Sequence, residues 1–219
     1  MQIEKDHKKF ERPYHLEYFP LPGGEKAIFE TDRIAISLAS RSGVAKIPGI
    51  KDGRISMIKE LIDSGINTPD CSSLGRLFDG VSAMLGICVR SDYEANAAIL
   101  LQKYAEDFND QLKNAYPVEL GSGVIKYNCL VKNILDDLAN NVSKQEVALK
   151  FHAWVCDSII GVVSLLKPEL LVYSGGCFQN ALLVNMLIDR MNMVGIKNYY
   201  FNKSIPTNDA GVSFGQSLF

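Results

Sequence analysis

The stretch Leu170-Leu171-Val172-Tyr173-Ser174-Gly175-Gly176-Cys177-Phe178-Gln179-Asn180 decides the expected fold. Its short apolar run is typical of a buried strand, the Ser-Gly-Gly turn breaks that strand, and an amphipathic helix is expected over 181–194. Adjacent glycines let backbone N–H groups approach an anion closely, and the start of the helix adds about half a positive charge. The unit can therefore hold a phosphate, although such a turn also occurs for topology alone.

Helices are expected through most of the chain before this unit. The spacing of apolar side chains predicts a strand over 15–19 and then helices over 25–40, 54–64, 93–114 and 130–140. Ser72 or Ser73 caps a further helix, which runs to Gly86 and carries Gly75 and Asp79 opposite its apolar stripe.

A long buried helix precedes the glycine turn. Ser143 and Glu146 match a capping box, in which each residue satisfies a free backbone donor of the other, and apolar residues then continue at helical spacing until Pro168. His152 lies on this helix. We interpret it as a packed or half-exposed helix residue rather than a ligand, because no second histidine lies one turn away.

The elements after the glycine turn complete an α/β part. A short strand is expected over 197–201, and Asn208-Asp209-Ala210-Gly211 opens a last helix of small residues. This ending, after long helices, favours an α/β fold with a large helical insertion. We expect a single domain over 1–219 in three parts: a polar N-terminal extension (1–13), a mainly helical part (25–166) and an α/β nucleotide-binding part (169–219).

Composition excludes several classes of function. The 219 residues are 47% hydrophobic with a formal net charge of −2, so no basic groove for nucleic acid is expected. Five cysteines without a C-x-x-C pair favour free thiols in a reducing cytoplasm. The longest apolar run, 159–166, is far short of the roughly 20 residues of a membrane span. We therefore expect a cytoplasmic protein without a membrane anchor.

Four motifs in order resemble the C-terminal part of the carbamoyltransferase HypF family. They are Phe19-Pro20-Leu21-Pro22-Gly23-Gly24 with Arg33, Ser72-Ser73-Leu74-Gly75-Arg76-Leu77-Phe78-Asp79, Tyr93-Glu94, and Ser174–Asn180 followed by Asn208-Asp209-x-Gly211. The resemblance implies one lobe of the actin-like ATPase (ASKHA) fold of Kae1/TsaD proteins. It also implies a role in [NiFe]-hydrogenase maturation, in which ATP and carbamoyl phosphate give carbamoyl adenylate and the carbamoyl group passes to the C-terminal cysteine of HypE.

The resemblance implies a nucleotide site but assigns no catalytic residue. Asp79 would accept hydrogen bonds from the ribose hydroxyls, while Gly75 leaves room for the nucleoside. The turn would take phosphate or adenine at Gly175 and Gly176, with the Asn180 amide as a donor. Asp209 would ligate a divalent metal, iron or magnesium.

The sequence also departs from the family pattern. The upstream HypF domains and the histidine cluster of the first lobe are not represented, and His7 and His15 do not reproduce that cluster, so Asp209 needs metal ligands from another chain. Ala95-Asn96, Ala181 and Ala210 replace Gly-Gln, arginine and glycine of the family.

Two functions from different classes remain open. The first is one lobe of a split or truncated carbamoyltransferase, whose partners are a HypE-like protein and either a separate chain with the upstream domains or a second copy. The alternative is a catalytically incompetent nucleotide-binding or interaction module. A nucleophilic Cys177 is a third possibility, although a packing role is favoured because no histidine lies nearby in the sequence.

Overall fold

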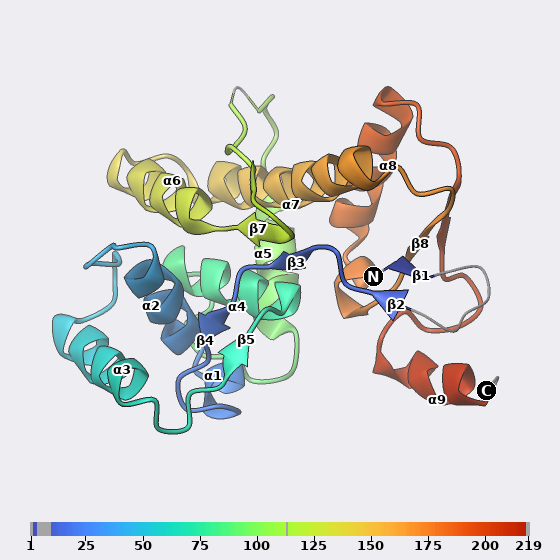
Figure 1. The fold of residues 1–219 in the computed structure, drawn as a ribbon. Coiled ribbons are helices and arrows are strands. Elements are labelled where there is room, and N and C mark those ends of the chain that lie inside the picture. Colours follow the sequence, from blue (N-terminus) through green and yellow to red (C-terminus); the bar gives the residue numbers. More distant parts are fainter. Residues whose placement is uncertain (1, 4–9, 113, 218–219) are drawn as a thin grey trace.

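The computed structural model describes residues 2–3, 10–112 and 114–217, which form a helical body with a small α/β part at its C-terminal end (Figure 1). The helices are α1 (Lys26–Phe29), α2 (Asp32–Arg41), α3 (Asp52–Ser64), α4 (Leu74–Met84), α5 (Asn96–Glu106), α6 (Asn128–Ala139), α7 (Lys144–Leu166), α8 (Ala181–Met193) and α9 (Val212–Gln216). Two short 3₁₀ helices are η1 (Gly176–Gln179) and η2 (Asp209–Gly211).

The strands are short and form four small sheets. They are β1 (Gln2–Ile3), β2 (Phe10–Glu11), β3 (His15–Leu16), β4 (Phe19–Pro20), β5 (Asp70–Cys71), β6 (Glu119–Leu120), β7 (Val124–Lys126), β8 (Leu171–Tyr173) and β9 (Tyr199–Phe201). β3 pairs in parallel with β7, which pairs antiparallel with β6, whereas β1 pairs with β2 and β4 with β5, both antiparallel. β8 and β9 form a separate parallel pair with Val172 opposite Tyr200.

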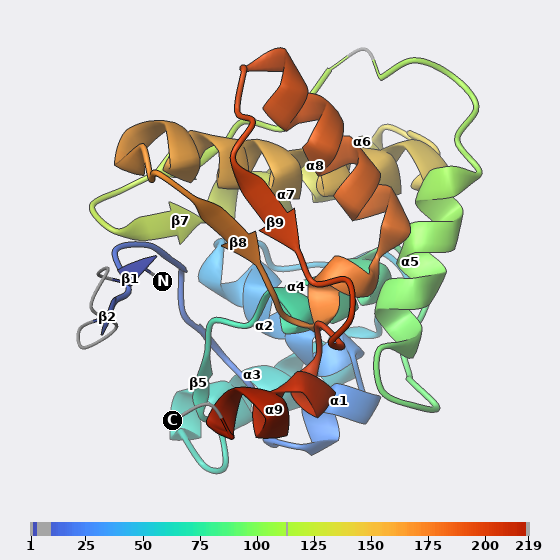
Figure 2. The same ribbon diagram turned by 90° about the vertical axis from the view of Figure 1, so that its right-hand side faces the viewer.

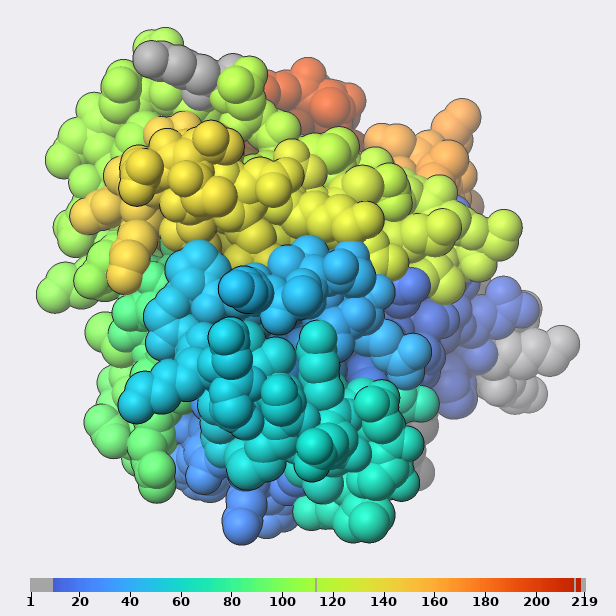
Figure 3. All heavy atoms as spheres, turned by 90° about the vertical axis from the view of Figure 1, so that its left-hand side faces the viewer, coloured from blue at the N-terminus to red at the C-terminus, as the bar shows by residue number. Residues whose placement is uncertain are grey.

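The core is built around α7, whose residues from Val147 to Cys156 are buried except for the partly buried Leu149. α5 and α8 pack against α7, and α4 packs between α2 and α5 (Figure 2). On another face, the residues of α6 lie directly against those of α2 (Figure 3). α7 is long and apolar enough to cross a membrane by length and composition, but its buried first half shows that it serves as the central core helix.

The predicted helix starts are largely confirmed. Ser73 caps α4 by accepting a hydrogen bond from the N–H of Arg76, and Ser143 caps α7 by accepting from the N–H of Glu146. The second half of the predicted capping box is wrong, because the Glu146 carboxylate pairs with Lys150 Nζ at 2.9 Å instead. Gly65 ends α3 in the left-handed conformation, as its position in the sequence predicts.

Three expected elements are divided or shortened in the structure. The helix expected over 25–40 is two helices, α1 and α2, and between them Thr31 Oγ1 donates a hydrogen bond to the carbonyl of Cys88 at 2.6 Å. The helix expected over 93–114 is confined to α5, which begins after Ala95 adopts a left-handed φ of 64°. The single strand expected over 15–19 is divided between β3 and β4, which belong to different sheets.

The strand before the glycine turn is only half-buried, which corrects the expected buried strand. Tyr173 lies in the core, whereas Val172 is 63% exposed. Its neighbour in β9, Tyr200, is 60% exposed. Side chains alternate between the two faces of a strand, so one face of this parallel pair is covered by α8 and the other remains open. Parallel sheets are ordinarily covered on both faces.

Candidate functional site

The candidate site lies where the first turns of α4 meet the turn that follows β8. A Cβ atom added to Gly75 would stand 3.9 Å from the Sγ atom of Cys177 and 3.6 Å from Ser73 Oγ, so the two segments are in close contact (Figure 2). Residues separated by about 100 positions are thereby brought together. The structure places Gly75, Asp79 and the glycine turn on the two sides of one corner.

The glycine turn leaves room for a ligand but does not offer every backbone donor. Gly175 has φ 110°, which only glycine adopts readily, and an added Cβ atom would meet nothing within 4 Å. Its own N–H is already donated to the carbonyl of Thr207 at 2.7 Å. Gly175 therefore contributes the conformation of the turn and free space rather than a backbone donor. At Gly176, an added Cβ atom would be 3.9 Å from Cβ of Asn208.

Asp79 is buried, which corrects the expectation that it lies on an open helix face. Its side chain is 4% exposed, and its Oδ2 atom lies 2.9 Å from Nη1 of Arg76. Among the described residues neither of these two atoms completes a hydrogen bond, so the contact is an ion pair with poor directionality. Burial raises the pKa of Asp79 to about 6, with Arg76 opposing this and Glu94 adding to it.

Asn180 is the cap of α8 and is bound to the core. Its Oδ1 accepts from the N–H of Leu183 at 2.9 Å, and its Nδ2 donates to Nε2 of His152 at 3.0 Å. His152 Nδ1–H in turn donates to the carbonyl of Ala148 at 2.8 Å, which assigns the tautomer. The Asn180 side chain therefore uses Oδ1 and one N–H of its amide inside the protein. The amide has a second N–H, so its role as a nucleotide donor stays a prediction.

Of the two expectations for His152, packed or half-exposed, the structure confirms the packed one, and its partner Asn180 was not predicted. The side chain is fully buried, and burial lowers the pKa of His152 to about 4, so the imidazole is neutral at physiological pH. It links the centre of α7 to the start of α8, immediately after the glycine turn. His152 and Asn180 are 28 positions apart, and no sequence signal pairs them.

Cys177 faces α4 beside Asp79. Burial and, to a smaller extent, the charge of Asp79 raise the pKa of this thiol to about 11, with Arg76 opposing them. The thiol is therefore protonated near neutral pH and a weak nucleophile. The structure favours the packing role over the catalytic one.

Asp209 begins η2, and the Asn208 side chain caps it by accepting from the N–H of Ala210 at 3.3 Å. Within 2–3, 10–112 and 114–217, no group of three or more His, Cys, Asp or Glu side chains could hold a metal ion. Asp209 alone does not fit a metal site, so its predicted role requires ligands from elsewhere. His7 lies outside the described residues.

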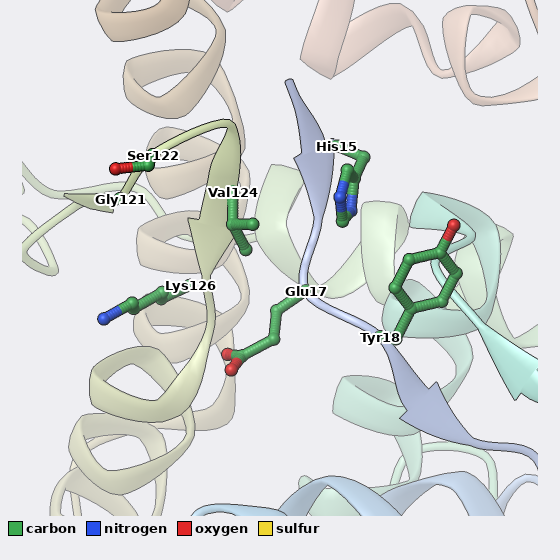
Figure 4. Close-up of a pocket in the computed structure, with 7 residues that line it drawn as sticks. All are labelled: His15, Glu17, Tyr18, Gly121, Ser122, Val124 and Lys126. Carbon is green, nitrogen blue, oxygen red and sulfur yellow. The ribbon is translucent and has the colours of Figure 1, made fainter. Parts of the chain in front are cut away.

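His15 lies in β3, where it lines a shallow open groove of about 570 Å³ (Figure 4). The ring of His15 stacks obliquely near that of Tyr18, with centroids 4.9 Å apart. Glu17 and Lys126 also line the groove, but their charged ends point away from the two rings. These groups do not converge on a common point.

Comparison with known proteins gives consistent matches along almost the whole chain. Residues 3–216 match the family model described as "Carbamoyltransferase, Kae1-like Domain, second subdomain". The chain is 30% identical to "Carbamoyltransferase HypF" of Rhodobacter capsulatus over 97% of its length. It is 27% identical, over 93% of its length, to a "Carbamoyltransferase HypF homolog" of Cupriavidus necator.

The structural comparison agrees. The crystal structure of a full-length HypF in a phosphate- and nucleotide-bound form superposes with a TM-score of 0.86 and 31% identity over 96% of this chain. The fold is thus the α/β lobe of a Kae1-like domain with a large helical part. The chain spans 28% of the Rhodobacter protein, 55% of the Cupriavidus homolog and 34% of the full-length HypF chain.

Proposed function

Because this chain belongs to the HypF carbamoyltransferases, as the second subdomain of their Kae1-like domain, we propose that it is one lobe of such an enzyme. In this role it binds ATP or carbamoyl adenylate where α4 meets the glycine turn. Together with the upstream HypF domains, in the cytoplasm, it transfers the carbamoyl group to the C-terminal cysteine of a HypE-like protein.

The observation that carries the proposal is a buried carboxylate, Asp79, which faces a glycine turn with free space and whose Oδ2 completes no hydrogen bond with the residues that the structure describes. A carboxylate can accept hydrogen bonds from two hydroxyl groups at once, which suits the vicinal hydroxyls of ribose. Gly75 keeps the adjacent helix surface clear. The nucleotide-bound form of the related full-length HypF supports this class of ligand.

The transfer step requires the rest of the enzyme. The thiolate of the partner cysteine attacks the carbamoyl carbon, the C–O bond to the phosphate of the adenylate breaks, AMP leaves, and the thiol proton passes to solvent. Asp209 is proposed to help hold iron or magnesium only when another polypeptide, such as the first lobe, supplies further ligands. A divalent ion there would screen phosphate charge.

Isothermal titration with ATP and Mg²⁺ tests the proposal. The chain alone is expected to bind at millimolar concentration or below detection, and addition of a polypeptide with the upstream domains should restore tight binding. The same mixture should add one carbamoyl group to the terminal cysteine of the HypE-like protein, measured by mass spectrometry. Tight ATP binding by the isolated chain, or ATP binding by the mixture that Asp79→Asn leaves unchanged, contradicts the proposal.

One observation favours the alternative, a non-catalytic interaction module. The open face of the β8–β9 pair exposes Val172, Tyr200 and Leu170, a surface suited to another subunit or a second copy of this chain. Such a module would bind the upstream polypeptide but leave the carbamoylation yield unchanged when added to it. A gain in yield on addition of this chain excludes the alternative.

A further inference from the structure

The ion pair between Arg76 and Asp79 is an unusual feature of the candidate site. The two residues are one helical turn apart on α4, with side chains 17% and 4% exposed. Charges this far from water are stabilised only when good geometry satisfies their hydrogen bonds. Here the Nη1 and Oδ2 atoms are 2.9 Å apart, yet neither completes a hydrogen bond among the described residues.

The ion pair between Arg76 and Asp79 lies beside the glycine turn. Arg76 lies on the turn of α4 that also carries Gly75, against Cys177, and it is nearer the helix start than Asp79. Cys177, next to Gly176, is close enough to Arg76 and Asp79 for both charges to shift the pKa of its thiol. A guanidinium at this place can reach either toward Asp79 or toward the turn, because arginine has a long flexible stem and five donors.

We propose that Arg76 is a specificity residue that exchanges partners: it pairs with Asp79 in the free chain and with the phosphates of a nucleotide once ribose hydroxyls occupy the carboxylate. This inference rests on the proposed nucleotide site and deepens it. A nucleoside that binds Asp79 must displace Arg76 from this carboxylate, and it has no phosphate with which Arg76 could pair instead. A nucleotide supplies one, since guanidinium matches phosphate geometry.

The exchange predicts discrimination between ATP and adenosine. Wild-type chain should bind ATP more tightly than adenosine. Replacement of Arg76 by glutamine should weaken ATP binding about tenfold, whereas adenosine binding should stay equal or become tighter because it no longer displaces a cation. The ratio of the two dissociation constants should therefore fall about tenfold, with Lys103→Gln, an exposed cation on α5, as the matched control that leaves the ratio unchanged.

NMR titrations measure these affinities even at millimolar concentration. With labelled arginine and aspartate, both ligands should move the Asp79 carboxyl resonance, and ATP should move the Arg76 Nε resonance further than adenosine does. The wild-type titration needs no variant and so remains decisive if Arg76→Gln fails to fold. Nucleotide binding with an unchanged ratio, or an Arg76 resonance that responds equally to both ligands, overturns the inference alone. No response of Asp79 to either ligand, with the upstream polypeptide present, overturns the proposed site as well.

Discussion

The buried Asp79 carboxylate lowers the stability of the fold when it is ionised, and it is also the group proposed to bind ribose. Its pKa of about 6 lies above the 3.8 of an exposed aspartate, so the folded state binds the proton more tightly. The ionised carboxylate therefore destabilises the fold progressively as pH rises from about 3.8 through 6, and the full cost is present above pH 6. Buried charges that reduce stability are typical of residues kept for binding or catalysis.

We predict that Asp79→Asn increases the free energy of unfolding at pH 7.5 by about 1–2 kcal/mol. One pKa unit corresponds to about 1.4 kcal/mol, and the loss of the Arg76 partner offsets part of the gain. The difference should disappear near pH 3.5, where wild-type Asp79 is protonated in both states. Urea unfolding at the two pH values measures the free energy of unfolding. If Asp79→Asn is less stable than wild type at pH 7.5, the pairing with Arg76 outweighs the cost of burial and the prediction is contradicted.

His152 has the opposite pH dependence. Its pKa of about 4 lies below the 6.5 of an exposed histidine, so protonation favours the unfolded chain. The stability that His152 contributes is complete above pH 6.5 and is lost as pH falls from 6.5 through 4.

His152→Gln, which keeps an acceptor for Asn180, should unfold with a flatter pH dependence in this interval. His152→Leu leaves the Asn180 amide without its acceptor and should cost about 1–3 kcal/mol more than His152→Gln at pH 7.5. Chemical denaturation of both variants distinguishes the two effects. Equal losses at pH 7.5 would show that the link to Asn180 contributes nothing.

At the scale of elements, the start of α5 explains one departure from the family. Ala95 occupies a left-handed φ of 64°, a conformation that costs a residue with a side chain about 1 kcal/mol and glycine almost nothing. The resemblance to the HypF family implies glycine at this position. Replacement of Ala95 by glycine should therefore raise the free energy of unfolding by about 0.5–1 kcal/mol.

The matched control lies two residues further on. Ala97→Gly, inside α5 and fully buried, should destabilise the chain by about 1 kcal/mol, because glycine there adds backbone entropy to the unfolded state and removes a packed methyl group. Thermal or urea unfolding measures both. Destabilisation by Ala95→Gly would show that the side chain of Ala95 contributes more than its conformation costs.

At the scale of the whole molecule, the open face of the β8–β9 pair predicts association. We expect the isolated chain to self-associate through Val172 and Tyr200, and expect Val172→Lys to reduce this without changing the free energy of unfolding, because that side chain is 63% exposed. Sedimentation velocity over a concentration series measures the effect. Met57→Lys, on an exposed part of α3, is the control, and equal effects of the two substitutions would contradict a specific interface.

Much of the candidate site could be predicted from local patterns. The cap at Ser73, the glycine turn, and the helix that carries Gly75 and Asp79 are confirmed, because capping, glycine conformation and apolar spacing act within a few residues. The interruption before α2 could not be predicted, since it depends on a hydrogen bond from Thr31 to a carbonyl 57 residues away.

The sequence by itself determined the main helices, the family, and which short segments are able to form the corner between α4 and the glycine turn. Only the tertiary structure decided that Asp79 is buried against Arg76, that Asn180 binds His152 instead of remaining free, and that one face of β8 stays open. The physical reason is that burial, pairing and pKa are properties of groups brought together from distant parts of the chain. Local sequence determines conformation, whereas packing determines which polar atoms remain available to a ligand.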